Sequence, residues 1–292
     1  MQLIEVDNHC IRTASWYRAK NHDAASSTTE MNTFSNQLRR LLPHQLKRPF
    51  KRWMGISETR LHPDWSILSK LGPCQTPHTI LDIGAHSGWF FHCWLDWCPK
   101  ATVHAFEPFP ASYQAASDLY GHDPRVHLHQ LAIGSESGEL SFNHLTDSRV
   151  SNSFLEPDKK VWESIAYETG SIDKVVVPVT TLDRFCEQNA IGDIFLMKID
   201  VQGFEIEALN GALATLPRVS YILVESAIQP LYLNSPRFSD VFEFLTAQGF
   251  HLMSFRAWHR GNHKLMEADL LFQRDGLEGP INTEVSRFYI GD

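Results

Sequence analysis

The sequence predicts an α/β protein with an open parallel β-sheet, and three observations lead to this fold class. From residue 78 onward, short apolar runs alternate with segments of helical periodicity, which is the pattern of repeated βα units. Two of the apolar runs, residues 194–199 and 221–224, are continuous, as expected of strands that are buried on both faces of a parallel sheet. The 292 residues are 43% apolar and 21% charged, which is the composition of a globular protein and excludes a disordered or membrane-embedded chain.

The first group of predicted elements alternates strictly between strand and helix. It consists of a strand over residues 78–85, a helix over 88–97, a strand over 102–106, a helix over 110–120 and a strand over 126–133. Gly138 indicates a turn into a short additional strand. Residues 150–171 show no steady period, so we expect a long loop that covers the ligand-binding end of the sheet.

The second group returns to the same alternation. It consists of strands over residues 175–179, 194–199, 221–224, 250–255 and 269–273 and of helices over 182–188, 204–216 and 238–248. Thr181 precedes the first of these helices, and we expect it to be the N-cap because a threonine hydroxyl can accept a hydrogen bond from a free N–H of the first turn. Together the two groups predict one open sheet.

Residues 1–60 are predicted to form a basic extension in front of a domain over residues 61–292. The extension carries 10 Lys and Arg against 5 Asp and Glu, which leaves 16 against 29 for the rest of the chain. Residues 22–33 are small and polar, as in a flexible connector, and residues 35–55 combine apolar positions at helical spacing with basic residues, which predicts a helical arm. Such an arm suits an anionic membrane surface or, as the favoured alternative, a packed surface on its own domain or in a homo-oligomer.

Charge and cysteine content narrow the classes of function. The net charge of −8 argues against a protein that binds nucleic acid by neutralising phosphates, and it favours an uncharged or cationic small molecule as the partner. The first residues lack the basic and apolar regions of a secretion signal, and no apolar stretch approaches the roughly 18 residues of a membrane span. The five cysteines are scattered and form no C-x-x-C pair, so we expect a cytoplasmic protein without a disulfide framework or a zinc site.

The ends of the first two predicted strands indicate a nucleoside site. In an open parallel sheet, the ligand lies beyond the carboxyl ends of the strands. The first strand leads into D-I-G-A-H-S-G, residues 82–88, where Gly84 and Gly88 allow a sharp turn and the close approach of a ligand. Glu107 ends the second strand 19 residues after Gly88, a position from which a carboxylate can bind both hydroxyls of a ribose.

The charge of the first loop favours S-adenosylmethionine over a dinucleotide. The spacing G-x-x-x-G departs from the dinucleotide fingerprint G-x-G-x-x-G, and Asp82 adds a carboxylate close to where a pyrophosphate would lie. Two like charges about 4 Å apart repel by roughly 1 kcal/mol in water and by about 4 kcal/mol at an effective dielectric constant of 20. The ammonium and sulfonium of S-adenosylmethionine avoid this repulsion, so a dinucleotide-dependent oxidoreductase is the disfavoured alternative.

A series of motifs resembles the FkbM family of S-adenosylmethionine-dependent methyltransferases. The motifs are, in order, ILDIGAHSGWF, AFEP, LAIG, TTLD, MKIDVQGFEIEALNGA and LVES, and they extend over about residues 78–275. The most specific is K-I-D-V-x-G-F-E at residues 198–205. The resemblance implies a Rossmann-like class I methyltransferase fold, in which a seven-stranded, mostly parallel sheet carries helices on both faces.

The same resemblance implies a donor site for S-adenosylmethionine. The amino-acid end of the donor is expected at the first loop, the ribose on Glu107 and the adenine along the end of the third strand. The predicted donor-binding residues are Asp82, Gly84, Ala85, His86, Gly88, Glu107, Pro108, Leu131, Ala132, Ile133 and Asp200.

Methyl transfer to a hydroxyl benefits from a base, and Asp200 and Glu225 are the principal candidates because they end adjacent predicted strands. A base within hydrogen-bond reach adds roughly 10²–10⁴ in rate. His86, in the first loop, is a minor catalytic candidate. The alternative for each carboxylate is a structural role, such as capping a helix. The pair could also bind Mg²⁺, but no third ligand is identifiable, so no metal site is predicted.

The acceptor contacts are predicted to be Arg149, Asn152, Ser153 and Gln202. Gln202 departs from the family, which usually has a glutamate in D-V-E-G. This change removes a negative charge beside the acceptor site, and it supports one alternative function, a methyltransferase-like binding or scaffold protein that has lost its chemistry. The favoured function is an S-adenosylmethionine-dependent O-methyltransferase that acts on a hydroxyl of a sugar, a glycan or a natural-product intermediate, with oxygen implied by the resemblance.

Lys198 lies inside an apolar predicted strand. An unpaired ammonium is costly in such surroundings, so we expect Lys198 to pair with a carboxylate such as Asp183 or Glu205.

Overall fold

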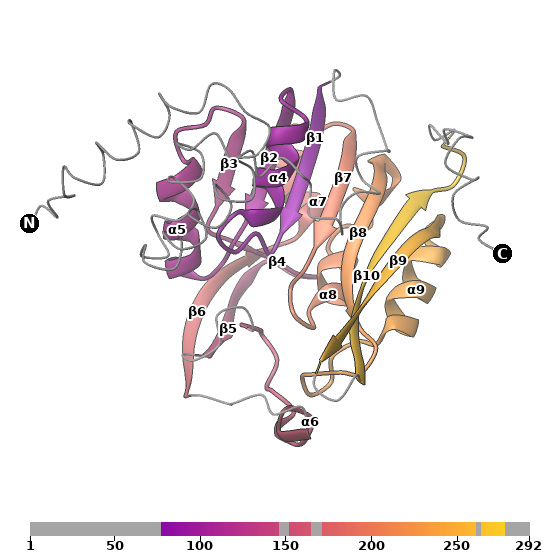
Figure 1. Cartoon of the computed structure of the whole chain (residues 1–292). Helices are drawn as coiled ribbons and strands as arrows, with labels where there is room; N and C mark the ends of the chain where they lie inside the picture. The colour runs from indigo at the N-terminus through magenta and orange to yellow at the C-terminus, as the bar shows by residue number, and fades with distance from the viewer. Residues whose placement is uncertain (1–76, 146–151, 165–170, 261–263, 278–292) are drawn as a thin grey trace, which may run out of the picture. The chain divides into compact units, whose positions relative to one another are not determined.

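The computed structural model of the chain describes residues 77–145, 152–164, 171–260 and 264–277. The predicted basic extension, its boundary at residue 60 and Arg149 lie outside these ranges. Within them, the chain forms a large sheet with helices against it and a smaller second sheet (Figure 1). No helix of the described ranges is both long enough and apolar enough to cross a membrane.

The main sheet has seven strands in the order β3-β2-β1-β7-β8-β10-β9 (Figure 1). The strands are β1 (His78–Ile83), β2 (Ala101–Phe106), β3 (Val126–His129), β7 (Ile194–Ile199), β8 (Val219–Ala227), β9 (Phe250–Arg260) and β10 (Lys264–Arg274). The pairs from β3 through β8 are parallel, and β10 is antiparallel to both β8 and β9. The predicted seven-stranded, mostly parallel sheet is confirmed.

Helices cover both faces of this sheet because the strands carry apolar side chains on both faces. The helices are α4 (Trp89–Trp97), α5 (Pro110–Tyr120), α7 (Leu182–Gln188), α8 (Glu205–Asn210) and α9 (Phe238–Ala247). On one face, Phe91 and Trp94 of α4 pack with Leu196 and Tyr221 of the sheet. On the other face, α7, α8 and α9 pack against the sheet in a second core, which includes Leu81 of β1, Met197 of β7 and Ile222 of β8.

The helix termini follow ordinary capping chemistry. Thr181 is the N-cap of α7, as predicted, and its hydroxyl accepts a hydrogen bond from the Arg184 N–H at 3.2 Å. Proline at the first position of α5 fits because that residue needs no hydrogen-bond donor. The predicted helix over 204–216 is too long: α8 ends at Asn210. Gly211 follows it, and a Cβ there would lie 2.0 Å from the carbonyl oxygen of Gly134.

The predicted strand over 126–133 is divided in the structure. β3 ends at His129, whose carbonyl oxygen accepts hydrogen bonds from the N–H groups of Glu107 and Leu131. The chain then leaves the main sheet, and β4 (Ala132–Ile133) pairs with β6 (Ile172–Thr180) in a three-stranded sheet of order β4-β6-β5. The additional strand indicated by Gly138 is β5 (Gly138–Leu145) of this second sheet.

The stretch expected to be a loop contains a short helix in its described part. Helix α6 (Lys159–Ser164) is anchored by Trp162, whose indole N–H donates to the carbonyl oxygen of Leu231 at 2.6 Å. Before α6, Ser153 forms an isolated bridge to Asn143 of β5, and Pro157 forms one to Tyr232. These contacts hold residues 152–158 near the carboxyl ends of the main strands. A single-turn 3₁₀ helix, Leu216–Arg218, precedes β8.

Candidate active site

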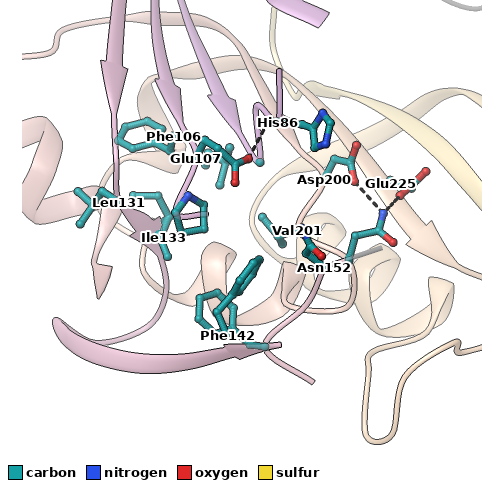
Figure 2. A pocket seen from close by; sticks show the side chains of 16 residues that line it. His86, Phe106, Glu107, Leu131, Ile133, Phe142, Asn152, Asp200, Val201 and Glu225 are labelled. Carbon is teal, nitrogen blue, oxygen red and sulfur yellow. Dashed lines mark hydrogen bonds between the residues drawn. The ribbon is translucent and has the colours of Figure 1, made fainter. Parts of the chain in front are cut away.

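A pocket lies at the carboxyl ends of β1, β2 and β7, where an open parallel sheet binds its ligands. Its volume is about 910 Å³ with the open mouth included. One side is apolar and the other is rich in carboxylates. Figure 2 shows this division: Leu131 and Ile133 lie on one side, Asp200 and Glu225 on the other, and Glu107 between them.

Most of the predicted site residues line this pocket. They are Gly84, His86, Glu107, Pro108, Leu131, Ala132, Ile133, Asn152, Asp200, Gln202 and Glu225. Asp82, Ala85, Gly88 and Ser153 are not among the lining residues, and Arg149 is outside the described residues. Five lining residues were missed by the sequence analysis: Ile83, Phe106, Phe142, Phe154 and Val201.

Glu107 is a buried carboxylate at the end of β2, with only 6% of the residue exposed. Its two oxygens accept hydrogen bonds from the backbone N–H groups of His86, at 2.7 Å, and Phe109, at 2.9 Å. Burial raises the pKa of Glu107 to about 7, although these two hydrogen bonds act in the opposite direction. A carboxylate oxygen has two lone pairs, so each retains one that could accept from a ligand hydroxyl.

The first loop brings the backbone of Gly84 and the side chain of His86 to the pocket. Gly84 has a φ of 83°, and a Cβ at this position would lie 1.9 Å from the carbonyl oxygen of Asp200. Gly88 also has a φ of 83°, but a Cβ there would meet the ring of Phe91, so its role is in packing of α4. The side chain of His86 lines the pocket from the turn between these glycines.

Asp82 contacts a lysine instead of a ligand. It is completely buried, and its Oδ1 lies 3.2 Å from Nζ of Lys198, its cross-strand neighbour on β7. The same Nζ lies 3.3 Å from Oδ2 of Asp200 and donates to the Gly84 carbonyl oxygen at 2.8 Å. Burial opposes a charged lysine, but Asp200 and Asp82 together hold the pKa of Lys198 above its usual value. The placement of Asp82 beside the ligand is therefore not supported by the structure.

Lys198 pairs with carboxylates, as predicted, but the two carboxylates named as candidates, Asp183 and Glu205, have other partners. Asp183 accepts hydrogen bonds from the N–H groups of Ala214, at 2.9 Å, and Thr215, at 2.7 Å. Glu205, which is 4% exposed, accepts one from the N–H of Gly203 at 2.8 Å. Both carboxylates hold backbone near their own helices, whereas the register of β1 with β7 determines the partner of Lys198.

The apolar side of the pocket is assembled from two sheets. Leu131, Ala132 and Ile133 come from the segment that leaves the main sheet, and Phe142 comes from β5. Phe154 of residues 152–158, called here the covering segment, contacts Phe142 edge to face, with ring centroids 4.9 Å apart. This wall could take a flat aromatic ring such as adenine. The sequence gives no signal for the two phenylalanines, because their position depends on the second sheet.

The polar side contains Asp200, Gln202 and Glu225. The Gln202 amide nitrogen donates to Oδ1 of Asp200 at 3.0 Å and to Oε2 of Glu225 at 2.5 Å. Burial alone would raise the pKa of Asp200. The ammonium of Lys198 and the amide of Gln202 outweigh burial and hold this pKa below its usual value. Burial raises the pKa of Glu225 well above its usual value, and the carboxylate of Asp200 adds to this effect. The pair therefore offers an ionised carboxylate beside a stronger base.

The covering segment closes this side of the pocket. Asn152 lines it, and its Oδ1 lies 3.0 Å from Nδ1 of His144. Ser153 is completely buried, and its hydroxyl donates to the Gln202 carbonyl oxygen at 2.6 Å. Ser153 therefore holds the loop after β7 in place and does not line the pocket. Its predicted role as an acceptor contact is not supported by this position.

These features fit the donor expected from the sequence. An apolar wall, a buried carboxylate with unused lone pairs and a loop without a Cβ at Gly84 match, in order, an adenine, a ribose and the amino-acid end of S-adenosylmethionine. The carboxylates of Asp200 and Glu225 line the polar side of the same pocket.

Comparisons with known proteins agree with this chemistry. The family model described as the methyltransferase FkbM domain matches residues 82–252. The 2-O-methyltransferase NoeI of Sinorhizobium fredii (strain NBRC 101917 / NGR234) is 30% identical over 174 residues, which are 57% of this chain and 68% of NoeI. Methyltransferase 1 of Beauveria bassiana (strain ARSEF 2860) is 24% identical over 191 residues, which are 62% of this chain and 75% of that protein.

Among solved structures, similarity is weaker. TrmK of M. capricolum in complex with S-adenosyl-homocysteine aligns with a TM-score of 0.42 and 11% identity over 74% of this chain and 69% of TrmK. The fibrillarin pre-rRNA processing protein of Methanococcus jannaschii aligns with a TM-score of 0.42 and 12% identity over 74% of this chain and 77% of that chain.

The family match extends over more than half of the chain and contains the loop after β1, the carboxylate that ends β2 and the segment from Asp200 to Glu225. The chain therefore belongs to the FkbM family of S-adenosylmethionine-dependent methyltransferases.

Proposed function

We propose that the protein transfers a methyl group from S-adenosylmethionine to a hydroxyl of a sugar, a glycan or a natural-product intermediate. The observation that carries this proposal is the joining of Asp200 and Glu225 through Gln202 at the polar side of the donor pocket. Two carboxylates at this place suit an acceptor whose O–H must lose a proton. The name of the relative NoeI, a 2-O-methyltransferase, supports oxygen as the acceptor atom.

The residues of the chain would hold the donor by three kinds of contact. Glu107 would accept hydrogen bonds from the ribose hydroxyls, Leu131 and Ile133 would pack against the adenine, and the Gly84 backbone would approach the amino-acid end. The bound donor supplies an electrophilic methyl group on a positively charged sulfur. Positioning of the acceptor in line with that methyl group could lower the barrier by about 7–11 kcal/mol, by analogy with well-oriented intramolecular reactions.

Glu225 is the proposed proton acceptor. As the acceptor oxygen forms its bond to the methyl carbon, the carbon–sulfur bond breaks and the hydroxyl proton passes to the Glu225 carboxylate. The raised pKa of Glu225 makes it the stronger base of the pair. Asp200, which Lys198 keeps ionised, would stabilise the positively charged sulfur of the donor. Turnover is therefore expected to rise with pH until Glu225 is ionised.

Release of S-adenosylhomocysteine on a panel of free sugars, oligosaccharides and hydroxylated metabolites tests the proposal. Mass spectrometry should show the gain of one methyl group in the accepted compound, and Glu225→Gln should reduce its formation by roughly 10²–10⁴-fold. Binding of the donor without any methylated product over the whole panel would instead favour the alternative of a methyltransferase-like binding or scaffold protein.

The setting of this activity is proposed from the sequence. We infer a cytoplasmic enzyme with a small-molecule or glycan acceptor and no nucleic-acid partner, because the chain is acidic and its cysteines form no disulfide pattern. Residues 35–55 are proposed to contact a membrane surface or a second copy of the chain.

Glu107→Gln is expected to weaken S-adenosylmethionine binding by roughly 10- to 100-fold, because hydrogen bonds to a charged group contribute about 1.5–3 kcal/mol. The pKa of wild-type Glu107 is about 7, and its ionised form accepts hydrogen bonds from the ribose hydroxyls better than its protonated form does. The affinity of the wild type for S-adenosylmethionine should therefore rise as the pH passes upward through 7, and that of the variant should not. Calorimetric titration on either side of pH 7 measures both effects. Glu139→Gln, at an exposed position on β5, is the control, and equal affinities for the two variants would contradict the assignment.

A further inference from the structure

Gln202 occupies an unusual position for a long polar side chain. Its φ is 52°, in the left-handed region, and Gly203 follows with a φ of 97°. The hydroxyl of Ser153 donates to the Gln202 carbonyl oxygen at 2.6 Å, which fixes the backbone of this turn to the covering segment. The side chain is thereby directed between Asp200 and Glu225, at the ends of β7 and β8.

The orientation of the Gln202 amide is determined by its neighbours. The Tyr232 hydroxyl donates to Oε1 of Gln202 at 3.3 Å, and Asp200, which is held ionised by Lys198, can only accept. The amide nitrogen therefore faces the carboxylates, and it has two hydrogens, one for Asp200 and one for Glu225. A single neutral group thus donates to both carboxylates.

Two neighbouring carboxylates require a compensating group. Like charges in a poorly solvated site repel, so one carboxylate takes up a proton or a cation lies between them. Glu225 is faced by Lys198 of β7, by Asp200 just after β7 and by Glu267 and Asp269 of β10, so carboxylates predominate around it among the described residues. In the described part of the chain, no three His, Cys, Asp or Glu side chains are arranged to hold a metal ion.

We propose that Gln202 is a positioning residue whose amide occupies the place of a bridging divalent cation, so that Asp200 and Glu225 work as a metal-independent pair. A glutamate at this position would present oxygen ligands from Asp200, Glu225 and its own side chain to one point. Oxygen ligands of this kind are those that Mg²⁺ and Mn²⁺ prefer. The catalytic consequence rests on the proposed function, whereas the metal and titration behaviour of the pair does not.

Two variants of similar side-chain length separate the contributions of the amide. Gln202→Glu keeps the length of the side chain and removes both N–H donors, and Gln202→Met removes all polar atoms. Both replacements are unbranched, so the backbone cost of the positive φ is similar in both. Thermal unfolding with and without S-adenosylmethionine checks that each variant folds and binds the donor.

Binding of Mn²⁺, followed by electron paramagnetic resonance on the full-length chain, is the first test. Gln202→Glu should bind one more Mn²⁺ ion than the wild type. The affinity of this additional site for Mn²⁺ should exceed the affinity of the same carboxylates in the wild type or in Gln202→Met by at least about 100-fold. The additional site should disappear in the Gln202→Glu/Glu225→Gln double variant. An equally tight Mn²⁺ site at these carboxylates in the wild type, or no additional site in Gln202→Glu, overturns the proposal.

Titration of ¹³C-labelled glutamate carboxyl groups is the second test, and it needs no acceptor. Glu225, assigned by its loss in Glu225→Gln, should titrate at higher pH in Gln202→Met than in the wild type by about one pH unit, because a hydrogen bond to the ionised form has been removed. A residue that only supports the fold would lower the thermal stability and leave this titration unchanged, and that result contradicts the proposal.

Turnover provides the last measurement. With an acceptor in hand, Gln202→Glu should be slower than the wild type by at least about tenfold and should recover when Mg²⁺ is added, while the wild type is unaffected by Mg²⁺ or by a chelator. Failure of every form to methylate any acceptor would reject the proposed function and leave the Mn²⁺ and titration results to decide on the amide. Inhibition of the wild type by a chelator would reject the metal-independent pair.

Discussion

Gly84→Ala is expected to lower the free energy of unfolding by roughly 2–5 kcal/mol and to weaken donor binding with it. A Cβ on residue 84 would lie 1.9 Å from the carbonyl oxygen of Asp200, which is backbone and belongs to the neighbouring strand end. The left-handed backbone conformation costs an alanine about 1–2 kcal/mol, and overpacking costs about 1–3 kcal/mol more. Because β1 and β7 must move apart to make room for the alanine side chain, the pocket between their ends should change shape.

The two costs can be measured separately, since the chain offers matched controls. Gly249 has a φ of 80°, similar to that of Gly84, but a Cβ there meets no atom within 4 Å. Gly249→Ala should therefore show only the conformational cost of about 1–2 kcal/mol. Gly138→Ala, with neither a positive φ nor a neighbour within 4 Å, should leave stability nearly unchanged. Urea denaturation of the three variants gives the comparison, and equal losses for Gly84 and Gly249 would contradict the steric argument.

The positions of several pocket residues could be predicted from sequence because they follow local patterns. Glu107 comes directly after a predicted strand and Leu131 lies near the end of the next one, and a strand that ends at the carboxyl edge of a parallel sheet delivers its last residues to the ligand. Gly84 could be recognised by its residue type in such a loop. None of these assignments requires knowledge of which residue a side chain meets on another element.

The contacts that could not be predicted from the sequence have the opposite character. Asp82 was expected beside the ligand and Lys198 beside Asp183 or Glu205, but the register of β1 and β7 places Asp82 and Lys198 next to each other inside the sheet. Pairing between distant strands is a property of the assembled sheet, and the residue sequence of either strand does not contain it. The clearest example is Gln202, which appears in the sequence only as a missing charge and in the structure as a donor to two carboxylates.

Lys198→Met is expected to lower the free energy of unfolding at neutral pH by about 3–5 kcal/mol, because it leaves a buried carboxylate without its partner. Asp82 is completely buried beside the ammonium of Lys198, and the Gly84 carbonyl oxygen would lose the hydrogen bond from the same group. The exposed pair of Lys174 and Glu156, with side chains 60% and 50% exposed, is the control. Lys174→Met should cost less than about 1 kcal/mol in the same urea denaturation.

The pH dependence of the loss distinguishes an uncompensated charge from lost packing. Burial already raises the pKa of Asp82, and without the ammonium it should rise further. A carboxyl group whose pKa is higher in the folded than in the unfolded protein binds more protons when folded, so the variant should lose stability as the pH rises from the unfolded value toward the folded one. The deficit relative to the wild type should therefore shrink in acid, and Asp82→Asn added to Lys198→Met should recover part of it at neutral pH. A deficit of constant size at every pH, unrelieved by Asp82→Asn, would mean that Lys198 contributes only by packing.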